Sequence, residues 1–391
     1  MKISIVGGGG RAGLPLALSL AAVGHKIIII DKDEDKVSKI NMRIMPFHEK
    51  DADEALRKYS LEELSAEVGN EKILGSDVCI LIIGTPVNSD GSPSTNTLLS
   101  VVSELTSYLH STKLLMLRST VYPGITQEIS GLLSSHGLKT LVSFCPERIA
   151  EGVALDEIKV LPQIIGASEE QAYLLSEEVF KKVTPKLIRT TVKEAEIGKL
   201  FTNTYRYFKF AIANEFFKIC VDQDIDWQKV WYSIKEDYPR AKDLPLPGFA
   251  AGPCLVKDTM QLDYFTKNTF DLGKISIKTN EEMPDYIINL LKNRYDLKNM
   301  TVGILGMTFK AGIDDFRSSL SFRLESGLQK VSKKVLCSDE MLQKDGFVSS
   351  EELISASDLV IIATPHSSYA TLKINTPLVD IWRVNPSESI I

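Results

Sequence analysis

The sequence lacks the features that mark membrane-inserted, zinc-stabilised or nucleic-acid-binding proteins. No apolar run among its 391 residues approaches the ~20 residues that a helix needs to span a bilayer. Its five cysteines include no C-x-x-C pair, so there is no sign of a structural zinc site, and so sparse a set fits a reducing cytosol. The net charge of −6 is the opposite of the basic excess that a general nucleic-acid binder needs.

These absences indicate a cytoplasmic protein with no metal centre, no nucleic-acid partner and no membrane partner. The first strand-like residues are followed at once by glycines, so we also expect neither a signal peptide nor a transit peptide. The net charge does not exclude a local basic pocket that binds a phosphate. The length exceeds what one hydrophobic core supports, so two or three domains are expected.

Short apolar, β-rich runs alternate with helical patterns in the first half of the chain. The expected strands are Ile3–Val6, Lys26–Ile30, Val78–Ile83, Leu114–Arg118, Thr140–Phe144 and Gln163–Gly166. From Val192 the apolar spacing becomes helical, and after a loop rich in proline and glycine a second helical stretch is expected from Val256 to Tyr295, broken near Pro284. Strand signals return at 300–306 and continue at Lys334–Cys337, Leu359–Ala363 and Leu378–Asp380.

This order predicts an α/β protein with two Rossmann-like, doubly wound parallel-sheet domains. A central all-α segment with a long helix joins them. We expect an N-terminal domain over residues 1–191, a helical domain over 192–298 and a smaller C-terminal domain over 299–391.

The first strand leads into a G-x-G-x-x-G turn formed by Gly8, Gly10 and Gly13. We expect Gly8 to allow the tight turn, Gly10 to let the backbone approach a pyrophosphate, and Gly13 to let helix and strand pack closely. The helix that starts near Gly13 would offer N–H groups and a positive dipole end to the phosphates. The turn alone is a weak signal, but its place between a strand and a helix predicts a dinucleotide site.

Asp31 ends the second expected strand, where a carboxylate accepts hydrogen bonds from an adenosine ribose and repels a 2′-phosphate. The cofactor is therefore expected to be NAD rather than NADP. Arg11 and Lys32 stand nearby and could soften that preference.

A second set of residues suits nucleophilic catalysis. Cys254 follows small residues and precedes an expected helix, whose dipole would lower the pKa of a thiol there. Lys199 and Asn203 lie on one helix face. Thr120 and Glu147 each follow an expected strand, where α/β sheets place groups that contact ligands. Taken singly, each residue is more often structural: a buried thiol, a solvated helix face or an ordinary loop.

Taken in order, these segments resemble the UDP-glucose/GDP-mannose 6-dehydrogenase family, most closely its UDP-N-acetyl-D-mannosamine branch. The matching motifs are G-G-G-R-A-G-L-P at 8–15, G-T-P at 84–86, S-T-V-Y-P-G at 119–124, P-E-R-I-A-E-G at 146–152, K-L-F-T-N-T at 199–204, G-P-C-L-V-K-D at 252–258 and G-M-T-F-K-A-G-I-D-D-F-R-S-S at 306–319. They span nearly the whole chain.

The resemblance implies a four-electron oxidation of the C6 alcohol of a nucleotide-linked hexose to a carboxylate, with two NAD+ used in succession. Cys254 would capture the aldehyde as a thiohemiacetal, which a second oxidation converts to a thioester. Lys199 and Asn203 would stabilise the oxyanion. A water bound by Lys199 or Asp258 would take the first alcohol proton. Thioester hydrolysis would use a water positioned by Thr120 and Asp258, with Glu147 as base, although the neighbouring Glu151 remains an alternative.

The resemblance also implies the binding residues. The expected cofactor contacts are Gly8, Gly10, Arg11, Ala12, Gly13, Asp31, Thr85, Thr120 and Arg317. The expected contacts with the nucleotide-diphosphate sugar are Arg148, Ile149, Ala150, Glu151, Lys199, Asn203, Arg240, Phe249, Ala250, Gly252, Phe309 and Lys310. Arg240 matches a family arginine supplied across a dimer interface, although its spacing to Cys254 is shorter than usual. A homodimer built on the central helices is expected.

Two features bear on the choice of sugar. Residues 146–166 look like the branch that acts on UDP-N-acetylhexosamines, and Arg148 stands where UDP-glucose enzymes usually carry phenylalanine. Its donor fork could bind an acetamido carbonyl or a phosphate. Ala250 and Ala251 replace a diglycine common before the cysteine motif. UDP-N-acetyl-D-mannosamine is the favoured substrate, with UDP-N-acetylglucosamine, UDP-glucose and GDP-mannose as alternatives.

Two other classes of function share parts of this pattern. A two-electron dehydrogenase of the hydroxyisobutyrate or 6-phosphogluconate type also joins a Rossmann domain to helices and uses a lysine and an asparagine at this spacing. It needs neither Cys254 nor a third domain. A non-catalytic sensor of NAD or a nucleotide sugar would bind the same ligands without turnover.

Overall fold

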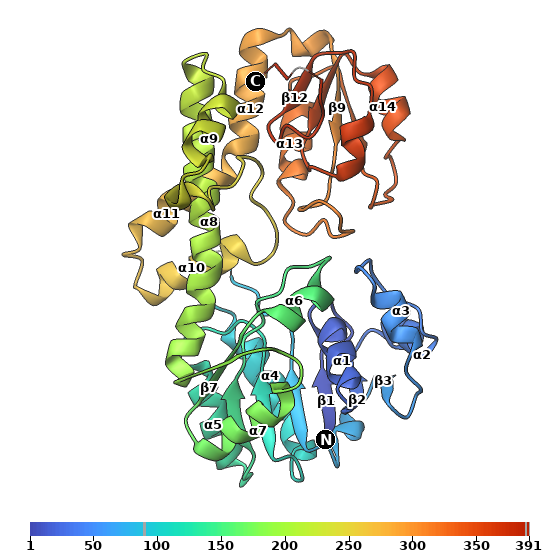
Figure 1. Ribbon diagram of the computed structural model, residues 1–391, viewed down its shortest axis with the longest axis vertical. Helices are drawn as coiled ribbons and strands as arrows, with labels where there is room; N and C mark the ends of the chain where they lie inside the picture. Colours follow the sequence, from blue (N-terminus) through green and yellow to red (C-terminus); the bar gives the residue numbers. More distant parts are fainter. Residues whose placement is uncertain (89–90, 388, 391) are drawn as a thin grey trace. The chain divides into compact units, whose positions relative to one another are not determined.

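The chain folds into two compact units, which are described separately. The computed structural model describes residues 1–88, 91–387 and 389–390. Unit 1 comprises Met1–Thr202 and unit 2 comprises Asn203–Ile391. The long helix α8 (Val192–Asp222) contains the boundary between them (Figure 1). The predicted fold class, two parallel-sheet α/β parts with a helical segment between them, is confirmed.

Unit 1 is built on one eight-stranded sheet with the order β3-β2-β1-β4-β5-β6-β7-β8. All neighbouring strands are parallel except β6 and β7, which run antiparallel. The strands are β1 (Lys2–Val6), β2 (Lys26–Ile30), β3 (Leu64–Glu67), β4 (Val78–Leu81), β5 (Leu114–Leu117), β6 (Leu141–Phe144), β7 (Gln163–Ala167) and β8 (Leu187–Thr190). Because β1 has β2 on one side and β4 on the other, the chain reverses its winding direction there, and ligands bind at such a point.

Helices cover both faces of this sheet. They are α1 (Gly13–Ala22), α2 (Glu34–Asn41), α3 (Ala52–Arg57), α4 (Thr95–Leu105), α5 (Ile125–Ser135), α6 (Ala154–Val160) and α7 (Glu170–Phe180). One apolar cluster joins α1, α6 and α7 to one face, and another joins α4 and α5 to the other face. Alternate residues of β1 supply both cores, with Ile3 and Ile5 in the first and Val6 in the second.

Unit 2 combines the central helices with a four-stranded parallel sheet of order β10-β9-β11-β12. Its strands are β9 (Thr301–Leu305), β10 (Lys334–Ser338), β11 (Leu359–Ile362) and β12 (Leu378–Asp380). Its helices, besides the second part of α8, are α9 (Trp227–Lys235), α10 (Leu255–Phe265), α11 (Asp271–Glu281), α12 (Met283–Arg294), α13 (Leu320–Gln329) and α14 (Ser350–Ala356). A shared apolar core joins Phe217 of α8, Ile287 of α12 and Ile304 of β9.

The long helix was predicted well, but the helical stretch after it was not. Residues 256–295 form three helices rather than one stretch broken only near Pro284. Lys267 and Asn268 both adopt positive φ angles, 57° and 61°, which end α10. Pro284 lies in the first turn of α12, where proline is tolerated.

Candidate active site

The glycine turn after β1 is shaped to receive a phosphate. A Cβ on Gly13 would lie 2.6 Å from the Gly8 Cα, so close helix–strand packing requires glycine there, as predicted. A Cβ on Gly10 would meet the Gly7 carbonyl oxygen at an ordinary 3.7 Å, which leaves space beside the backbone. Ala12, the N-cap of α1, has a methyl group that cannot accept a hydrogen bond, so the helix N–H groups suit an external anion.

The tight turn predicted at Gly8 also depends on Gly7. Gly7 carries the positive φ, 74°, and a Cβ there would lie 2.0 Å from the Ile82 carbonyl oxygen. Gly8 must also be glycine, because a Cβ there would lie 2.7 Å from the Ile5 carbonyl oxygen. The tight turn therefore needs glycine at both positions, and Gly7 stands one position before the recognised motif.

Asp31 lies at the end of β2, beside this turn. One carboxylate oxygen accepts the Gly9 N–H at 3.0 Å, and the other accepts the Asp33 N–H at 3.2 Å. The carboxylate is thereby held next to the glycine backbone. The turn, the helix start and this carboxylate together fit NAD.

We expect Asp31→Asn to weaken discrimination between the two nicotinamide cofactors. The variant keeps an oxygen for the Gly9 N–H but removes the charge that repels a 2′-phosphate. The ratio of the NADP+ to NAD+ dissociation constants should fall by about tenfold or more, as measured by titration calorimetry. Asp33→Asn is the matched control, since Asp33 caps α2 through the Lys36 N–H. An unchanged ratio in Asp31→Asn would assign cofactor choice to other residues.

The loops that follow β4 and β5 are tied together. The Thr85 hydroxyl donates to the Thr120 carbonyl oxygen at 2.6 Å, which brings together two predicted cofactor residues. Glu196 of α8 accepts the Gly124 N–H at 2.7 Å and the Thr126 N–H at 3.0 Å, so it caps the start of α5. Helix α8 therefore fixes the start of α5, a few residues after Thr120.

Glu147 is fixed by a buried cation that the sequence analysis did not select. Arg118, at the end of β5, forms an ion pair with the Glu147 carboxylate, and only 2% of its side chain is exposed. The same guanidinium donates to the Cys145 carbonyl and the Gln163 side chain, at 3.1 and 2.9 Å. The other Glu147 oxygen accepts the Arg148 and Ile149 N–H groups. Both oxygens therefore have partners within unit 1.

The rest of the 147–154 segment is held by other carboxylates. Glu157 accepts the Ala150 N–H at 2.5 Å, and the buried Glu49 accepts the Gly152 and Ala154 N–H groups at 2.8 and 2.7 Å. The N–H groups of Ile149 and Ala150 are thus already satisfied. Substrate contacts made by their backbones would use the carbonyl groups.

Arg11 and Arg148 both point to partners inside unit 1. Arg11 lies 3.7 Å from Glu151 and stacks over the Phe47 ring, which links the glycine turn to the predicted substrate segment. Arg148 donates to the Pro162 carbonyl, and burial lowers its pKa while the nearby Glu147 raises it. In this conformation the Arg148 guanidinium therefore binds a carbonyl group of the protein itself.

Helices α8 and α10 carry the predicted catalytic residues Cys254, Asp258 and Asn203. Cys254 is exposed and forms the N-cap of α10, and the Asp258 N–H donates to its carbonyl oxygen at 2.9 Å. The Asn203 amide donates to the fully buried Asp258 carboxylate at 2.6 Å, and Lys257 lies 3.1 Å from its other oxygen. Lys199 precedes Asn203 by one turn of α8.

The other cysteines differ from Cys254. All five cysteines lie in the described part of the chain, and the remaining four are buried. Burial raises the pKa of the Cys145 thiol to about 11 and that of the Cys79 thiol to about 12. Only the thiolate is a good nucleophile. Exposure and the helix N-terminus therefore single out Cys254.

The loop before Cys254 packs on the core of unit 2. Phe249 and Ala250, two predicted substrate residues, are both only 4% exposed. Gly252 has a φ of 106°, and a Cβ there would lie 2.7 Å from the Phe309 ring. The close approach of Gly252 places Phe309 next to the Cys254 loop, as expected for a substrate contact.

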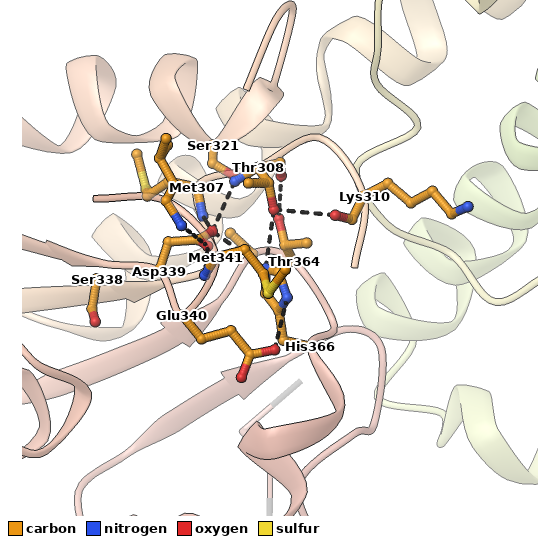
Figure 2. Close-up of polar contacts among 12 residues, drawn as sticks. Met307, Thr308, Lys310, Ser321, Ser338, Asp339, Glu340, Met341, Thr364 and His366 are labelled. Carbon is orange, nitrogen blue, oxygen red and sulfur yellow. Dashed lines mark hydrogen bonds and ion pairs between the residues drawn. The ribbon is translucent and has the colours of Figure 1, made fainter. Parts of the chain in front are cut away.

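Three further predicted residues lie in unit 2. Lys310 is exposed, and Figure 2 shows its side chain pointing away from the buried polar residues around Thr308. Arg317 donates to the Asp315 carboxylate, with its Nε 2.9 Å from one of the oxygens. Arg240 lies on a short 3-10 helix and donates to the Tyr238 hydroxyl at 3.0 Å.

Comparison with known proteins covers both units. Residues 1–184 match the NAD binding domain of the UDP-glucose/GDP-mannose dehydrogenase family, residues 193–282 its central domain and residues 303–384 its UDP binding domain. The UDP-N-acetyl-D-mannosamine dehydrogenase of Methanocaldococcus jannaschii is 30% identical over 381 residues, which cover 94% of this chain and 86% of that protein. The chain belongs to the UDP-glucose/GDP-mannose dehydrogenase family.

This family membership establishes an NAD-dependent nucleotide-sugar dehydrogenase. Another relative, the UDP-glucose 6-dehydrogenase AglM of Haloferax volcanii, is 27% identical and covers 95% of this chain and 93% of its own. The solved structure of UDP-D-ManNAc dehydrogenase from Pyrococcus horikoshii superimposes with a TM-score of 0.92 at 25% identity, covering 100% of this chain and 97% of the other. Within residues 1–88, 91–387 and 389–390, no helix is both long and apolar enough to cross a membrane.

Proposed function

We propose that this dehydrogenase oxidises UDP-N-acetyl-D-mannosamine at C6 to the uronate, for the synthesis of surface polysaccharides. The observation that carries the four-electron chemistry is Cys254, an exposed thiol at the start of α10. A two-electron dehydrogenase has no use for such a thiol. The choice of sugar is supported by the 146–166 segment and by relatives that bear this substrate in their names.

The proposed reaction begins with removal of the C6 alcohol proton by a water that Lys199 or Asp258 binds. Bound NAD+ supplies a hydride acceptor at each of two oxidations. The Cys254 thiolate adds to the aldehyde carbon to form a thiohemiacetal, and the second loss of a hydride and a proton leaves a thioester. Lys199 and Asn203 stabilise the oxyanion. Water then displaces Cys254, which gives the carboxylate and the free thiol.

Glu147 is the proposed base for this hydrolysis, with Glu151 as the alternative. Arg118 and two backbone N–H groups fix the orientation of the Glu147 carboxylate, whereas Glu151 pairs with Arg11. If Glu147 is the base, Glu147→Gln should accumulate the Cys254 thioester, which mass spectrometry of the intact protein detects. Glu151→Gln is the matched comparison.

The substrate proposal is tested by the ratio kcat/KM for a panel of sugars. UDP-N-acetyl-D-mannosamine should exceed UDP-N-acetylglucosamine, UDP-glucose and GDP-mannose by about tenfold or more. UDP-glucose and GDP-mannose lack the acetamido group and leave its polar partners unpaired, and UDP-N-acetylglucosamine, the C2 epimer, presents the group in the other orientation. Arg148 donates to Pro162 in this conformation, so the expectation does not depend on that residue. A higher value for any other sugar would replace the proposed substrate.

We also propose a homodimer formed through α8. One face of this helix carries exposed apolar residues spaced three, four or seven positions apart, namely Phe201, Tyr205, Ile212, Phe216 and Ile219. Such a stripe is the pattern by which helices of two copies pack.

The division of the chain into three domains, with boundaries after residues 191 and 298, is also a proposal.

Ile212→Glu should convert the dimer to a monomer, because it places a charge in the middle of this stripe. Light scattering coupled to gel filtration should give half the wild-type mass. Leu174→Glu is the matched control, since Leu174 is equally exposed but lies on α7. A wild-type protein that is already monomeric would contradict the proposed interface.

A further inference from the structure

A buried polar network lies at the ends of β9, β10 and β11, where Figure 2 shows side chains from the three following loops converging. His366, from the loop after β11, is fully buried and lies at the centre. Its Nε2 is 3.0 Å from the Thr308 hydroxyl and 3.3 Å from the Asp339 carboxylate. Glu340 lies 3.1 Å from Nδ1.

The imidazole contacts both ends of the loop that carries Phe309 and Lys310. The Thr308 hydroxyl donates its proton to the Lys310 carbonyl oxygen at 3.1 Å, so it accepts from Nε2–H of His366. At the other end, the Gly312 N–H donates to Nδ1 at 3.3 Å. One ring therefore holds the start and the end of a five-residue loop.

Asp339 completes this arrangement from β10. One of its oxygens accepts the Met307 and Thr308 N–H groups at 2.5 and 2.9 Å, and the other accepts the Met341 and Leu342 N–H groups. Asp339 is therefore saturated with donors, and its side chain is fully buried.

Asp339 occupies the same place in unit 2 that Asp31 occupies in unit 1. Asp31 and Asp339 both follow the second strand of a parallel sheet and both accept N–H groups from the turn after the first strand. The Asp339 carboxylate is also contacted by His366, and its side chain is fully buried. In unit 2 the carboxylate at this position binds the backbone at the start of the loop and contacts His366.

We propose that His366 is a positioning residue that braces the Thr308–Gly312 loop so that Phe309 and Lys310 meet the nucleotide diphosphate. The inference rests on the proposed function and on the contacts with the nucleotide sugar that the family resemblance implies for these two side chains. Phe309 packs against Gly252, and Lys310 points away from the network into the exposed side of the loop. A loose loop would leave both residues to be ordered at each binding event, which weakens affinity.

Two variants separate the two ends of the brace. His366→Gln retains an amide nitrogen near the Nε2 position, next to Thr308, whereas His366→Asn retains an amide near Nδ1, next to Gly312. Each keeps one contact and loses the other. Leu353→Ala is the matched control, because Leu353 is fully buried in unit 2 without belonging to the network, and its truncation destabilises the same sheet.

The measurement is the dissociation constant for UDP and for NAD+ on the full chain, by titration calorimetry. Both His366 variants should raise the UDP value by about tenfold, the effect of one lost hydrogen bond and some loop ordering. NAD+ affinity should stay at the wild-type level. Hydrogen exchange should increase in the peptide covering 306–313 in the His366 variants only.

Wild-type UDP affinity in both His366 variants would contradict the proposed role of His366. An equal loss of UDP affinity in Leu353→Ala would contradict it as well. Oxidation of UDP-N-acetyl-D-mannosamine by the wild type is measured alongside. If UDP binds but this sugar is not oxidised, the proposed substrate fails while the brace is still decided by the UDP values. If the wild type binds no UDP, both are contradicted.

Discussion

Cys254→Ser loses uronate formation, with a fall in rate of about three orders of magnitude or more, the scale seen when a nucleophile is removed. A serine hydroxyl at this helix start is far less ionised than a thiol, so the aldehyde is not captured and the second oxidation does not follow. The assay follows the uronate by liquid chromatography and NADH by absorbance. At most one slow hydride step should remain.

The control for this variant is Cys220→Ala. Cys220 lies buried on α8, and burial raises the pKa of its thiol. The Cys220→Ala variant should therefore oxidise the sugar at the wild-type rate, apart from any change in stability. Uronate formation at the normal rate in Cys254→Ser would exclude the thioester route.

Arg118→Met destabilises unit 1 by about 3–5 kcal/mol, because it leaves the Glu147 carboxylate without its buried cation. The Arg118 side chain is 2% exposed and that of Glu147 is 13% exposed, so water does little to compensate. The free energy of local opening is measured by hydrogen exchange of the β5 and β6 amides. This readout is preferable to global unfolding because the chain contains two units.

A double-mutant cycle tests whether the loss comes from the pair. Adding Glu147→Gln removes the unpaired charge, so the double variant should recover much of the loss. Lys181→Met is the control from the surface, where the pair with Glu178 is about half exposed and should contribute less than about 1 kcal/mol. Equal losses in Arg118→Met and Lys181→Met would mean that the buried pair does not stabilise unit 1.

The strands that the sequence predicts and those that it misses differ in burial. The fully apolar runs, such as β4 and β5, were recognised because both faces of a central parallel strand are covered. The missed strands are the two outer ones, β3 and β8, where exposed and half-buried positions bring serine, glutamate, arginine and threonine into the run. Short edge strands therefore show only a weak apolar pattern in the sequence and are hard to predict.

The candidate site shows a similar division. Motif residues such as Cys254, Asp258 and Asn203 could be selected because their types and order are distinctive, but the hydrogen bond between Asn203 and Asp258 is seen only in the fold. Arg118 and Glu196 act through contacts with residues far along the chain, which no local spacing reveals. Lys257 lies inside a recognised motif, and its position next to Asp258 in the sequence could have indicated that it pairs with this carboxylate.

The central claim is tested most directly by counting NADH per sugar. A limiting amount of UDP-N-acetyl-D-mannosamine, consumed completely in excess NAD+, should yield two NADH and one uronate for each sugar, because the aldehyde stays on Cys254 until the second oxidation. One NADH per sugar, with release of an aldehyde, would contradict the account and favour a two-electron dehydrogenase. Binding of the sugar without any NADH would favour a sensor.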